Sequence, residues 1–268
     1  MLPTNIWIAN QAIAQQKVLI YALGGGNGHI QRAHLIAQQF SCATIMHQKE
    51  SPFSSSVPVM HPGEKTLASW SVQTLTECAA SHDCVVVDTF PQGIAHEITE
   101  EIIQQYESSF LVGRYLREEM YHEYKDSCSW YNDVWLPYCP EQCEWDHPPK
   151  GVYAGVFARP IAINRERVSL CVIGNHNLMP NRWTSLFPAK TAFINHRFHT
   201  LPHAQKYLCV GAGYNLFWEL NSLDLEVAHI PMEKRYDDQF RRVMRFGTVV
   251  STYQDLFAFL KDGSWHNV

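Results

Sequence analysis

The segment that most constrains the fold is VLIYALGGGNGHI, in which an apolar run ends at three glycines and a histidine follows. The run at 17–23 predicts a buried strand, and the apolar spacing after His29 predicts a helix over 30–40. Glycines at a strand-to-helix turn permit positive φ and let another group approach the backbone closely. A helix N-terminus adds free N–H groups and partial positive charge. The sequence therefore predicts a ligand-binding turn here.

Strand-like and helix-like segments alternate along most of the chain. Strands are predicted at 17–23, 43–48, 84–90, 109–115, 168–174, 191–196, 206–213 and 226–231. Helices are predicted at 30–40, 66–82, 93–108, 214–223, 237–246 and 251–263. This alternation is typical of an α/β fold in which helices cover parallel sheets.

The alternation stops over residues 118–150, which are rich in Trp, Tyr, Cys and Pro. We expect one helix there and a connector that leads to a domain boundary. The alternation then resumes, which indicates a second unit of the same kind. We therefore predict two Rossmann-like parallel-sheet domains that face a cleft, with boundaries 1–150 and 151–268.

Composition excludes several classes of protein. Hydrophobic residues make up 46% of the chain and charged residues 18%, which is typical of a globular protein with ample core material. The net charge of -5 argues against nonspecific nucleic-acid binding. No apolar run approaches the roughly 20 residues of a membrane span, and the N-terminus lacks the features of a secretory signal. We expect a cytoplasmic protein with no nucleic-acid partner and no integral membrane segment, with peripheral membrane contact left open.

The eight cysteines raise the question of a metal site. Cys139 and Cys143 form a C-x3-C pair, with Cys128, His122 and His147 nearby. The spacing is not that of a standard zinc knuckle, and a second tight pair is absent. We therefore expect reduced thiols and no metal or other cofactor, with zinc at the C-x3-C pair as the alternative.

The glycine-rich turn does not match the two commonest nucleotide-binding motifs. It lacks the Gly-Lys-Ser/Thr of a P-loop. The third glycine of a dinucleotide fingerprint would fall at position 29, which is a histidine, and no acid stands clearly at the end of the second predicted strand. Nicotinamide binding is therefore disfavoured.

The segment GGGNGHIQRAHLIA resembles the opening of the GT-B nucleotide-sugar enzymes, including the peptidoglycan N-acetylglucosamine transferase group. GNGHIQRA is also similar to the G-x-G-H-x-x-R of predicted glycosyltransferases of this superfamily and of the UDP-sugar hydrolase of pseudaminic acid synthesis. VVVDTFPQGI and LCVGAGYNLFWELNSLDLEVAHIPMEKRYDDQFRRV resemble later motifs of these families, in the same order. Two features depart from the pattern: the second domain is short, and its first loop is GNHN (174–177) rather than a double glycine.

The resemblance implies a compact GT-B fold and a metal-independent glycosyltransferase. The enzyme would move a sugar from a nucleotide-sugar donor, expected to be UDP-linked, to an unidentified acceptor hydroxyl. The donor would bind to the second domain and the acceptor to the first. Two alternatives stay open: a nucleotide-sugar hydrolase in which His29 activates water, and a non-catalytic nucleotide-binding or scaffold protein.

The candidate catalytic residues are His29 and Asp88. His29 could act as a general base at neutral pH, or it could only cap a helix. Asp88 ends a predicted strand and could orient an acceptor hydroxyl, act as its base, or cap a turn. Arg32 lies one helical turn beyond His29 and could clamp a carboxylate or phosphate, or pair with a surface acid.

The candidate donor site lies at the second strand-to-helix turn. Backbone amides of that turn could bind phosphates, and the resemblance assigns Glu219 to the ribose hydroxyls and Asp238 and Gln239 to the donor sugar. For the turn itself the alternative is a plain tight turn, and for Glu219 it is a solvated helix acid. For Asp238 and Gln239 it is an acid that complements the dipole at a helix N-terminus. The predicted substrate-binding residues are Gly25, Gly26, Asn27, Gly28, Arg32, Gly174, Asn175, Gly211, Gly213, Tyr214, Asn215, Glu219, Asp238 and Gln239.

Overall fold

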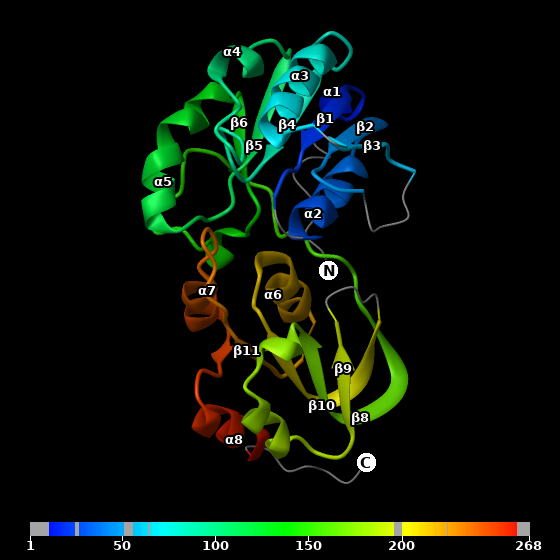
Figure 1. Cartoon of the computed structure of the whole chain (residues 1–268), viewed down its shortest axis with the longest axis vertical. Coiled ribbons are helices and arrows are strands. Elements are labelled where there is room, and N and C mark those ends of the chain that lie inside the picture. The colour runs from blue at the N-terminus through cyan, green and yellow to red at the C-terminus, as the bar shows by residue number, and fades with distance from the viewer. Residues whose placement is uncertain are drawn as a thin grey trace. The chain divides into compact units, whose positions relative to one another are not determined.

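The computed structural model describes residues 11–24, 27–50, 56–63, 65–195, 200–223 and 225–261. The chain divides into two compact units, Met1–Phe157 and Ala158–Val268 (Figure 1). The expected boundary at residue 150 falls before Val152–Tyr153, a strand that pairs with the sheet of the first unit. For this reason the segment just after residue 150 belongs to the first unit.

The first unit contains a parallel sheet of seven strands in the order β3-β2-β1-β4-β5-β6-β7. The strands are β1 (Lys17–Tyr21), β2 (Cys42–Met46), β3 (Val59–Met60), β4 (Cys84–Asp88), β5 (Ser108–Val112), β6 (Asp133–Leu136) and β7 (Val152–Tyr153). The order runs outward from β1 in one direction and from β4 in the other, so it reverses between these two strands. All five residues of β4 are buried, as expected of a β-branched strand that is covered on both faces.

The helices of the first unit connect these strands. They are α1 (Gln11–Ala14), α2 (Asn27–Ala37), α3 (Leu67–Ala79), α4 (Glu100–Ile103) and α5 (Glu118–Tyr124), with 3₁₀ turns η2 (Lys125–Trp130) and η3 (Pro140–Gln142). Ile30 and Ile36 of α2 pack with Val18 and Ile20 of β1 in one buried cluster. This packing fixes the helix that follows the glycine-rich turn.

The second unit contains a parallel sheet of five strands in the order β12-β11-β10-β8-β9 (Figure 1). The strands are β8 (Ala162–Gly174), β9 (Thr191–Ile194), β10 (Thr200–Val210), β11 (Val227–Ile230) and β12 (Thr248–Val249). The helices are α6 (Tyr214–Asn221), α7 (Gln239–Phe246) and α8 (Tyr253–Lys261), with 3₁₀ turns η4 (His176–Leu178) and η5 (Asn181–Leu186). Here the strand order reverses between β8 and β10.

The two parallel sheets with their helices confirm the predicted α/β class. None of the described helices combines the length and apolar character needed to cross a bilayer.

The predicted helix at 93–108 is wrong, because only α4 within it is helical. Gly93 has φ +79° and His96 has φ +58°, both in the left-handed region that a right-handed helix excludes. The side chain of Glu97 turns back and accepts a hydrogen bond from the N–H of Ala95 at 2.8 Å. The apolar spacing that suggested one long helix therefore belongs to a loop followed by a short helix.

The segment 118–150 is more than the predicted helix and connector. Besides α5 it supplies β6, which pairs with β5 and extends the sheet. The ring of Trp135 stacks on Phe110, with centroids 4.1 Å apart and an interplanar angle of 15°. Aromatic residues that suggested an irregular connector thus pack into the core.

One polar residue of the second unit lies in a core environment. His229 of β11 is completely buried, and neither of its ring nitrogens has a hydrogen-bond partner among the described residues. The ring of Phe217 lies 4.7 Å from it, centroid to centroid. Burial, with a further effect of Arg242, lowers the pKa of His229 from 6.5 to about 3.

We expect His229 to make the protein sensitive to acid. The unfolded chain binds this proton near pH 6.5, whereas the folded chain binds it near pH 3, so stability is lost as the pH falls between these values. Linkage predicts a loss of about 2 kcal/mol at pH 5 relative to pH 8. The measurement is the free energy of unfolding in urea at pH 8 and pH 5. The difference between the two values should shrink by about 2 kcal/mol in His229→Leu. It should be unchanged in the control His203→Leu, which alters an exposed histidine. Equal pH dependence in the wild type and His229→Leu would contradict the assignment.

Candidate functional site

The first cluster of candidate residues lies where β1 and β4 end. In parallel α/β sheets, ligands bind at the carboxyl ends of the strands, at the point where the strand order reverses. The turn after β1 leads into α2, which carries His29 and Arg32, and Asp88 is the last residue of β4. The fold therefore brings together at this edge three residues that the sequence analysis selected.

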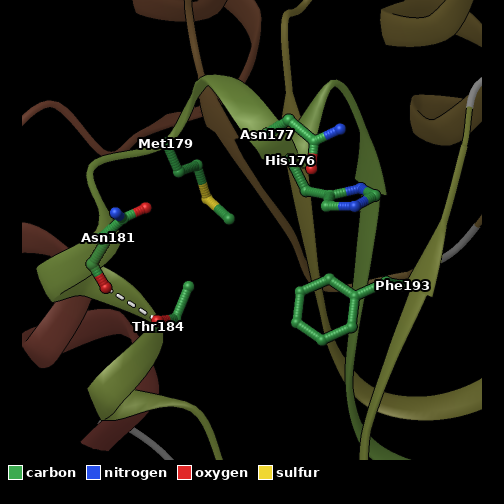
Figure 2. Close-up of a pocket in the computed structure, with 6 residues that line it drawn as sticks. All are labelled: His176, Asn177, Met179, Asn181, Thr184 and Phe193. Carbon is green, nitrogen blue, oxygen red and sulfur yellow. Dashed lines mark hydrogen bonds between the residues drawn. The ribbon is translucent and has the colours of Figure 1, made fainter.

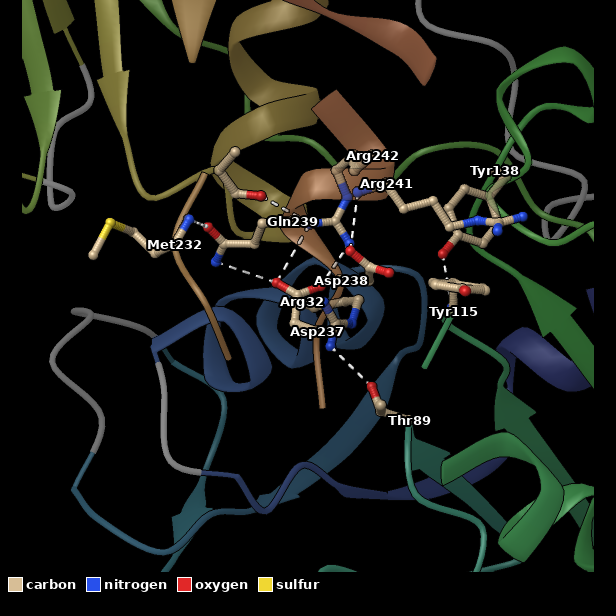
Figure 3. A network of polar contacts seen from close by, with 11 residues as sticks. Arg32, Thr89, Tyr115, Tyr138, Met232, Asp237, Asp238, Gln239, Arg241 and Arg242 are labelled. Atoms are coloured by element: carbon tan, nitrogen blue, oxygen red, sulfur yellow. Dashed lines mark hydrogen bonds and ion pairs between the residues drawn. The ribbon is translucent and has the colours of Figure 1, made fainter. Parts of the chain in front are cut away.

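The three side chains form a buried polar network. The Nδ1 atom of His29 lies 2.7 Å from Oδ2 of Asp88. The guanidinium of Arg32 donates through Nε to Oδ1 and through Nη2 to Oδ2 of Asp88, both at 2.7 Å. It also donates to Oγ1 of Thr89 at 3.2 Å (Figure 3). Asp88 is completely buried and Arg32 is 1% exposed, whereas the His29 side chain is 12% exposed.

Asp88 is ionised at neutral pH. Burial alone would raise the pKa of its carboxyl, but Arg32 and His29 outweigh this effect and hold the pKa well below its usual range. A carboxylate so strongly held does not take up a proton from a substrate hydroxyl. Of the roles considered for Asp88, the geometry favours orientation of His29 over action as the base.

His29 is neutral at pH 7 and carries its proton on Nδ1. Burial lowers the pKa of the imidazole, and Arg32 and Arg114 lower it further, against the opposing effect of Asp88. Because the carboxylate of Asp88 can only accept, Nδ1–H is the donor, and Nε2 keeps its lone pair. No described residue makes a hydrogen bond to Nε2, so this atom is available as a base.

Gly24 makes room for the imidazole of His29. A Cβ atom at this position would lie 2.2 Å from Cδ2 and 2.4 Å from Nε2 of the ring. The Phe90 ring stacks on the imidazole, with centroids 5.8 Å apart and an interplanar angle of 27°. Gly24, Phe90 and Asp88 together fix the ring. The predicted residues Gly25 and Gly26 lie outside the described residues.

We expect Gly24→Ala to displace His29 from Asp88. Gly24 is itself buried, so the new methyl group can be accommodated only if the ring moves. In an enzyme that uses His29 as its base, turnover should fall about 10²–10⁴-fold, which is the usual contribution of a general base. The double variant Gly24→Ala/His29→Asn should be no slower than the slower single variant, because both changes disable the same group. Multiplicative losses in a steady-state turnover assay would contradict this expectation.

The loop after β4 holds residues that the sequence analysis missed. Thr89 has φ +78°, a conformation that costs a non-glycine residue about 1–3 kcal/mol and is concentrated at functional sites. Glu97 supports the loop, since it also accepts a hydrogen bond from the hydroxyl of Tyr21. Arg114, just after β5, is 9% exposed and acts electrostatically on His29. In the sequence it falls inside the strand predicted at 109–115, so nothing there marked it as a site residue.

In the second unit, the carboxyl ends of β8 and β10 meet. Gly174 has φ +99°, and a Cβ there would lie 2.3 Å from the carbonyl oxygen of Val210. The N–H of Asn175 donates to the same oxygen at 3.2 Å. Gly211, with φ +85°, begins the turn into α6. These predicted residues therefore lie together where the strand order of this sheet reverses.

A buried arginine fixes the turn into α6. Arg242 is completely buried, and its Nη1 donates to the carbonyl of Ala212, between Gly211 and Gly213, at 2.8 Å. Its Nη2 donates to Oδ1 of Asp237 at 2.6 Å (Figure 3). The sequence analysis missed this pair, because RYDDQFRRVMR has the composition of a solvated basic face. Beyond the turn, the predicted residues Tyr214 and Asn215 are buried in the first turn of α6.

Glu219 of α6 is 1% exposed and is paired with Arg159. Nε of Arg159 donates to Oε1 at 2.8 Å, and Nη2 donates to Oε2 at 3.2 Å. Oε1 also accepts a hydrogen bond from the backbone N–H of Arg159 at 3.4 Å, so the carboxylate of Glu219 is engaged within the second unit. Its contact with ribose stays a prediction.

Asp238 and Gln239 also have partners in the second unit. Asp238 is the N-cap of α7 and accepts a hydrogen bond from the N–H of Arg241 at 2.9 Å. This is the position given by the alternative interpretation of Asp238, an acid at a helix N-terminus. Gln239 is 3% exposed, and its Oε1 accepts from the N–H of Met232 at 2.9 Å (Figure 3). Both side chains fix the connection from β11 to α7, and their contact with a donor sugar stays a prediction.

The cysteines do not gather into a metal cluster in the part of the chain that the structure describes. There, no group of three or more His, Cys, Asp or Glu side chains is placed to hold a metal ion, and all eight cysteines are free thiols. Cys139 and Cys143 flank η3. Comparison with known proteins adds no assignment, since no family model and no curated protein matches the chain.

Proposed function

We propose that the chain is a glycosyltransferase of compact GT-B architecture, with two Rossmann-like domains. It moves a sugar from a UDP-linked donor to an acceptor hydroxyl, and His29 is the general base. The observation that carries the proposal is the neutral imidazole whose Nδ1–H is held by Asp88 and whose Nε2 has no protein partner among the described residues. The order of the GT-B-like motifs along the chain supports it.

In the proposed reaction, the acceptor hydroxyl gives its proton to Nε2 of His29 as its oxygen bonds to the anomeric carbon of the donor sugar. The bond from that carbon to the diphosphate oxygen breaks, and its electron pair leaves with the nucleoside diphosphate. Asp88 stabilises the imidazolium that forms. The N–H groups of Gly211 and Gly213 donate to the carbonyls of Ile230 and Gly211, so we assign the diphosphate to the backbone amides of the first turn of α6.

We assign Arg32 to Asp88 rather than to the substrate. Its guanidinium is 1% exposed and is engaged by Asp88 and Thr89. It keeps the carboxylate ionised, and the ionised carboxylate in turn fixes the tautomer of His29.

The proposal is tested by incubating the protein with UDP-sugars, with and without a panel of hydroxyl acceptors. We expect release of UDP that depends on the acceptor, together with a glycosylated product. UDP release that is independent of any acceptor would replace the transferase by a hydrolase. Binding of UDP-sugars without turnover would replace it by a non-catalytic nucleotide-binding protein.

A further inference from the structure

The loop from Thr89 to Glu97, between β4 and α4, carries two of the groups that surround His29. Thr89 accepts a hydrogen bond from Arg32, and Phe90 stacks on the imidazole. The loop is built mostly of turns, and Thr89 has φ +78°, a conformation that persists only where the surrounding structure determines it. The position of His29 therefore depends on the contacts that hold this loop.

The far end of the loop is anchored to β1 through Tyr21 and Glu97. Tyr21 is the last residue of β1 and is completely buried. Its hydroxyl donates to Oε1 of Glu97 and accepts from the N–H of Ile94 at 3.1 Å. Burial and the neighbouring carboxylate raise the pKa of Tyr21 well above its usual range, so the phenol keeps its proton at neutral pH. One hydroxyl thus binds two polar groups of the loop.

The second carboxylate oxygen of Glu97 closes the loop on itself. Oε2 accepts from the N–H of Ala95 at 2.8 Å. Gly93 has φ +79°, and a Cβ atom there would lie 2.3 Å from Oε2, so the missing side chain of Gly93 admits the carboxylate. Glu97 is only 7% exposed, and hydrogen bonds must offset the cost of burying an acid. The hydroxyl of Tyr21 and the N–H of Ala95 do so, and they fix the loop at the same time.

The path from this anchor to His29 is short. The N–H of Gly93 donates to the carbonyl of Phe90 at 2.9 Å, so a single turn joins the anchored end of the loop to the phenyl ring that stacks on the imidazole. We propose that Tyr21 and Glu97 are positioning residues for His29, which hold this phenyl ring against the imidazole. The inference concerns the site of the proposed function and rests on that function where turnover is concerned.

The test is Tyr21→Phe in the full chain, measured by ¹⁵N–¹H correlation spectra of the histidine rings and by turnover. The change removes only the hydroxyl, so the aromatic ring still fills its place in the core. The titration midpoint of His29 should rise, because a displaced Phe90 exposes the imidazole and burial then lowers its pKa less. With the UDP-sugar that the wild type uses, kcat should fall about 10- to 100-fold, the loss that a small misplacement causes, and KM for the donor should stay unchanged.

Glu97→Gln is the milder variant of the same anchor. The glutamine keeps the length of the side chain and an acceptor for the N–H of Ala95, so only its contact with Tyr21 is altered. It should move the His29 midpoint in the same direction as Tyr21→Phe, by a smaller amount. This variant keeps the test decisive if Tyr21→Phe does not fold.

Two matched controls remove a hydroxyl elsewhere. Tyr106 is a buried tyrosine of the same unit whose hydroxyl donates to the carbonyl of Leu75 at 2.6 Å. Tyr106→Phe should leave the His29 midpoint and kcat unchanged. Thr184, in the second unit, donates through its hydroxyl to the carbonyl of Asn181 at 2.7 Å (Figure 2). Thr184→Val should leave the His29 spectrum unchanged.

An unchanged His29 midpoint in both variants of the anchor would overturn the inference. The hydrogen bond from the Tyr131 hydroxyl to the carbonyl of Pro91, at 2.6 Å, would then suffice to hold the loop. An equal shift in Tyr106→Phe would overturn it too, because it would report a general loosening of the unit. The proposed function is tested separately, since a shifted midpoint in a protein that turns over no UDP-sugar supports the positioning role and removes the transferase.

Discussion

His29→Asn should lower turnover by about 10²–10⁴-fold and leave the affinity for the nucleotide-sugar nearly unchanged. The amide retains a hydrogen-bonding side chain beside Asp88 but cannot take up a proton at neutral pH. The donor is expected to bind mainly to the second unit, so its dissociation constant should hardly change. Single-turnover kinetics and calorimetric titration of the same preparation separate the two effects.

The control for this variant is His203→Asn, an exposed histidine on β10. It should retain full turnover. If His29→Asn also retained near-full turnover, His29 would be a positioning or capping residue. Asp88 could not replace it as the base, because its pKa is held well below the usual range.

Asp88→Asn should destabilise the protein by about 3–5 kcal/mol and also disable the base. It removes the negative charge that faces the guanidinium of Arg32, and breaking a buried ion pair from one side costs this much. The asparagine can also present its N–H groups to His29, which favours the wrong tautomer. Urea unfolding measures the first effect and turnover measures the second.

Two comparisons distinguish loss of the charge from general damage. Asp126→Asn, at an exposed site on η2, should change the free energy of unfolding by less than about 0.5 kcal/mol. The double variant Arg32→Met/Asp88→Leu should recover much of the lost stability but none of the activity, since apolar side chains can replace a buried ion pair. A double variant as unstable as Asp88→Asn would show that packing, rather than the unpaired charge, sets the cost.

Much of the fold was predictable because buried parallel strands leave a strong local signal. CVVVD and KVLIY are apolar, β-branched runs bounded by polar residues, and both form central strands. The helix predicted at 93–108 failed because two residues adopt positive φ and Glu97 binds back to its own loop. Such conformations depend on tertiary contacts, and apolar spacing does not encode them.

The candidate site was predictable in its residues but not in their partners. The glycine-rich turn and the end of β4 selected His29 and Asp88, since parallel strands bring their carboxyl ends to one edge. The ion pair of Glu219 with Arg159 links positions sixty residues apart, and no local pattern indicates it. The role of Gly24 was also hidden, because its missing Cβ makes room for a side chain of the same turn rather than for a ligand.

The most direct test of the central claim is a ¹⁵N–¹H correlation measurement of the histidine rings between pH 5 and 8, with His29→Asn to assign the signal. The account predicts a neutral His29 at pH 7, protonated on Nδ1 and bare on Nε2. It also predicts a titration midpoint below 6.5, because burial opposes the charged form. A ring that is cationic at pH 7, or that carries its proton on Nε2, would contradict the account, since His29 could then not serve as the base.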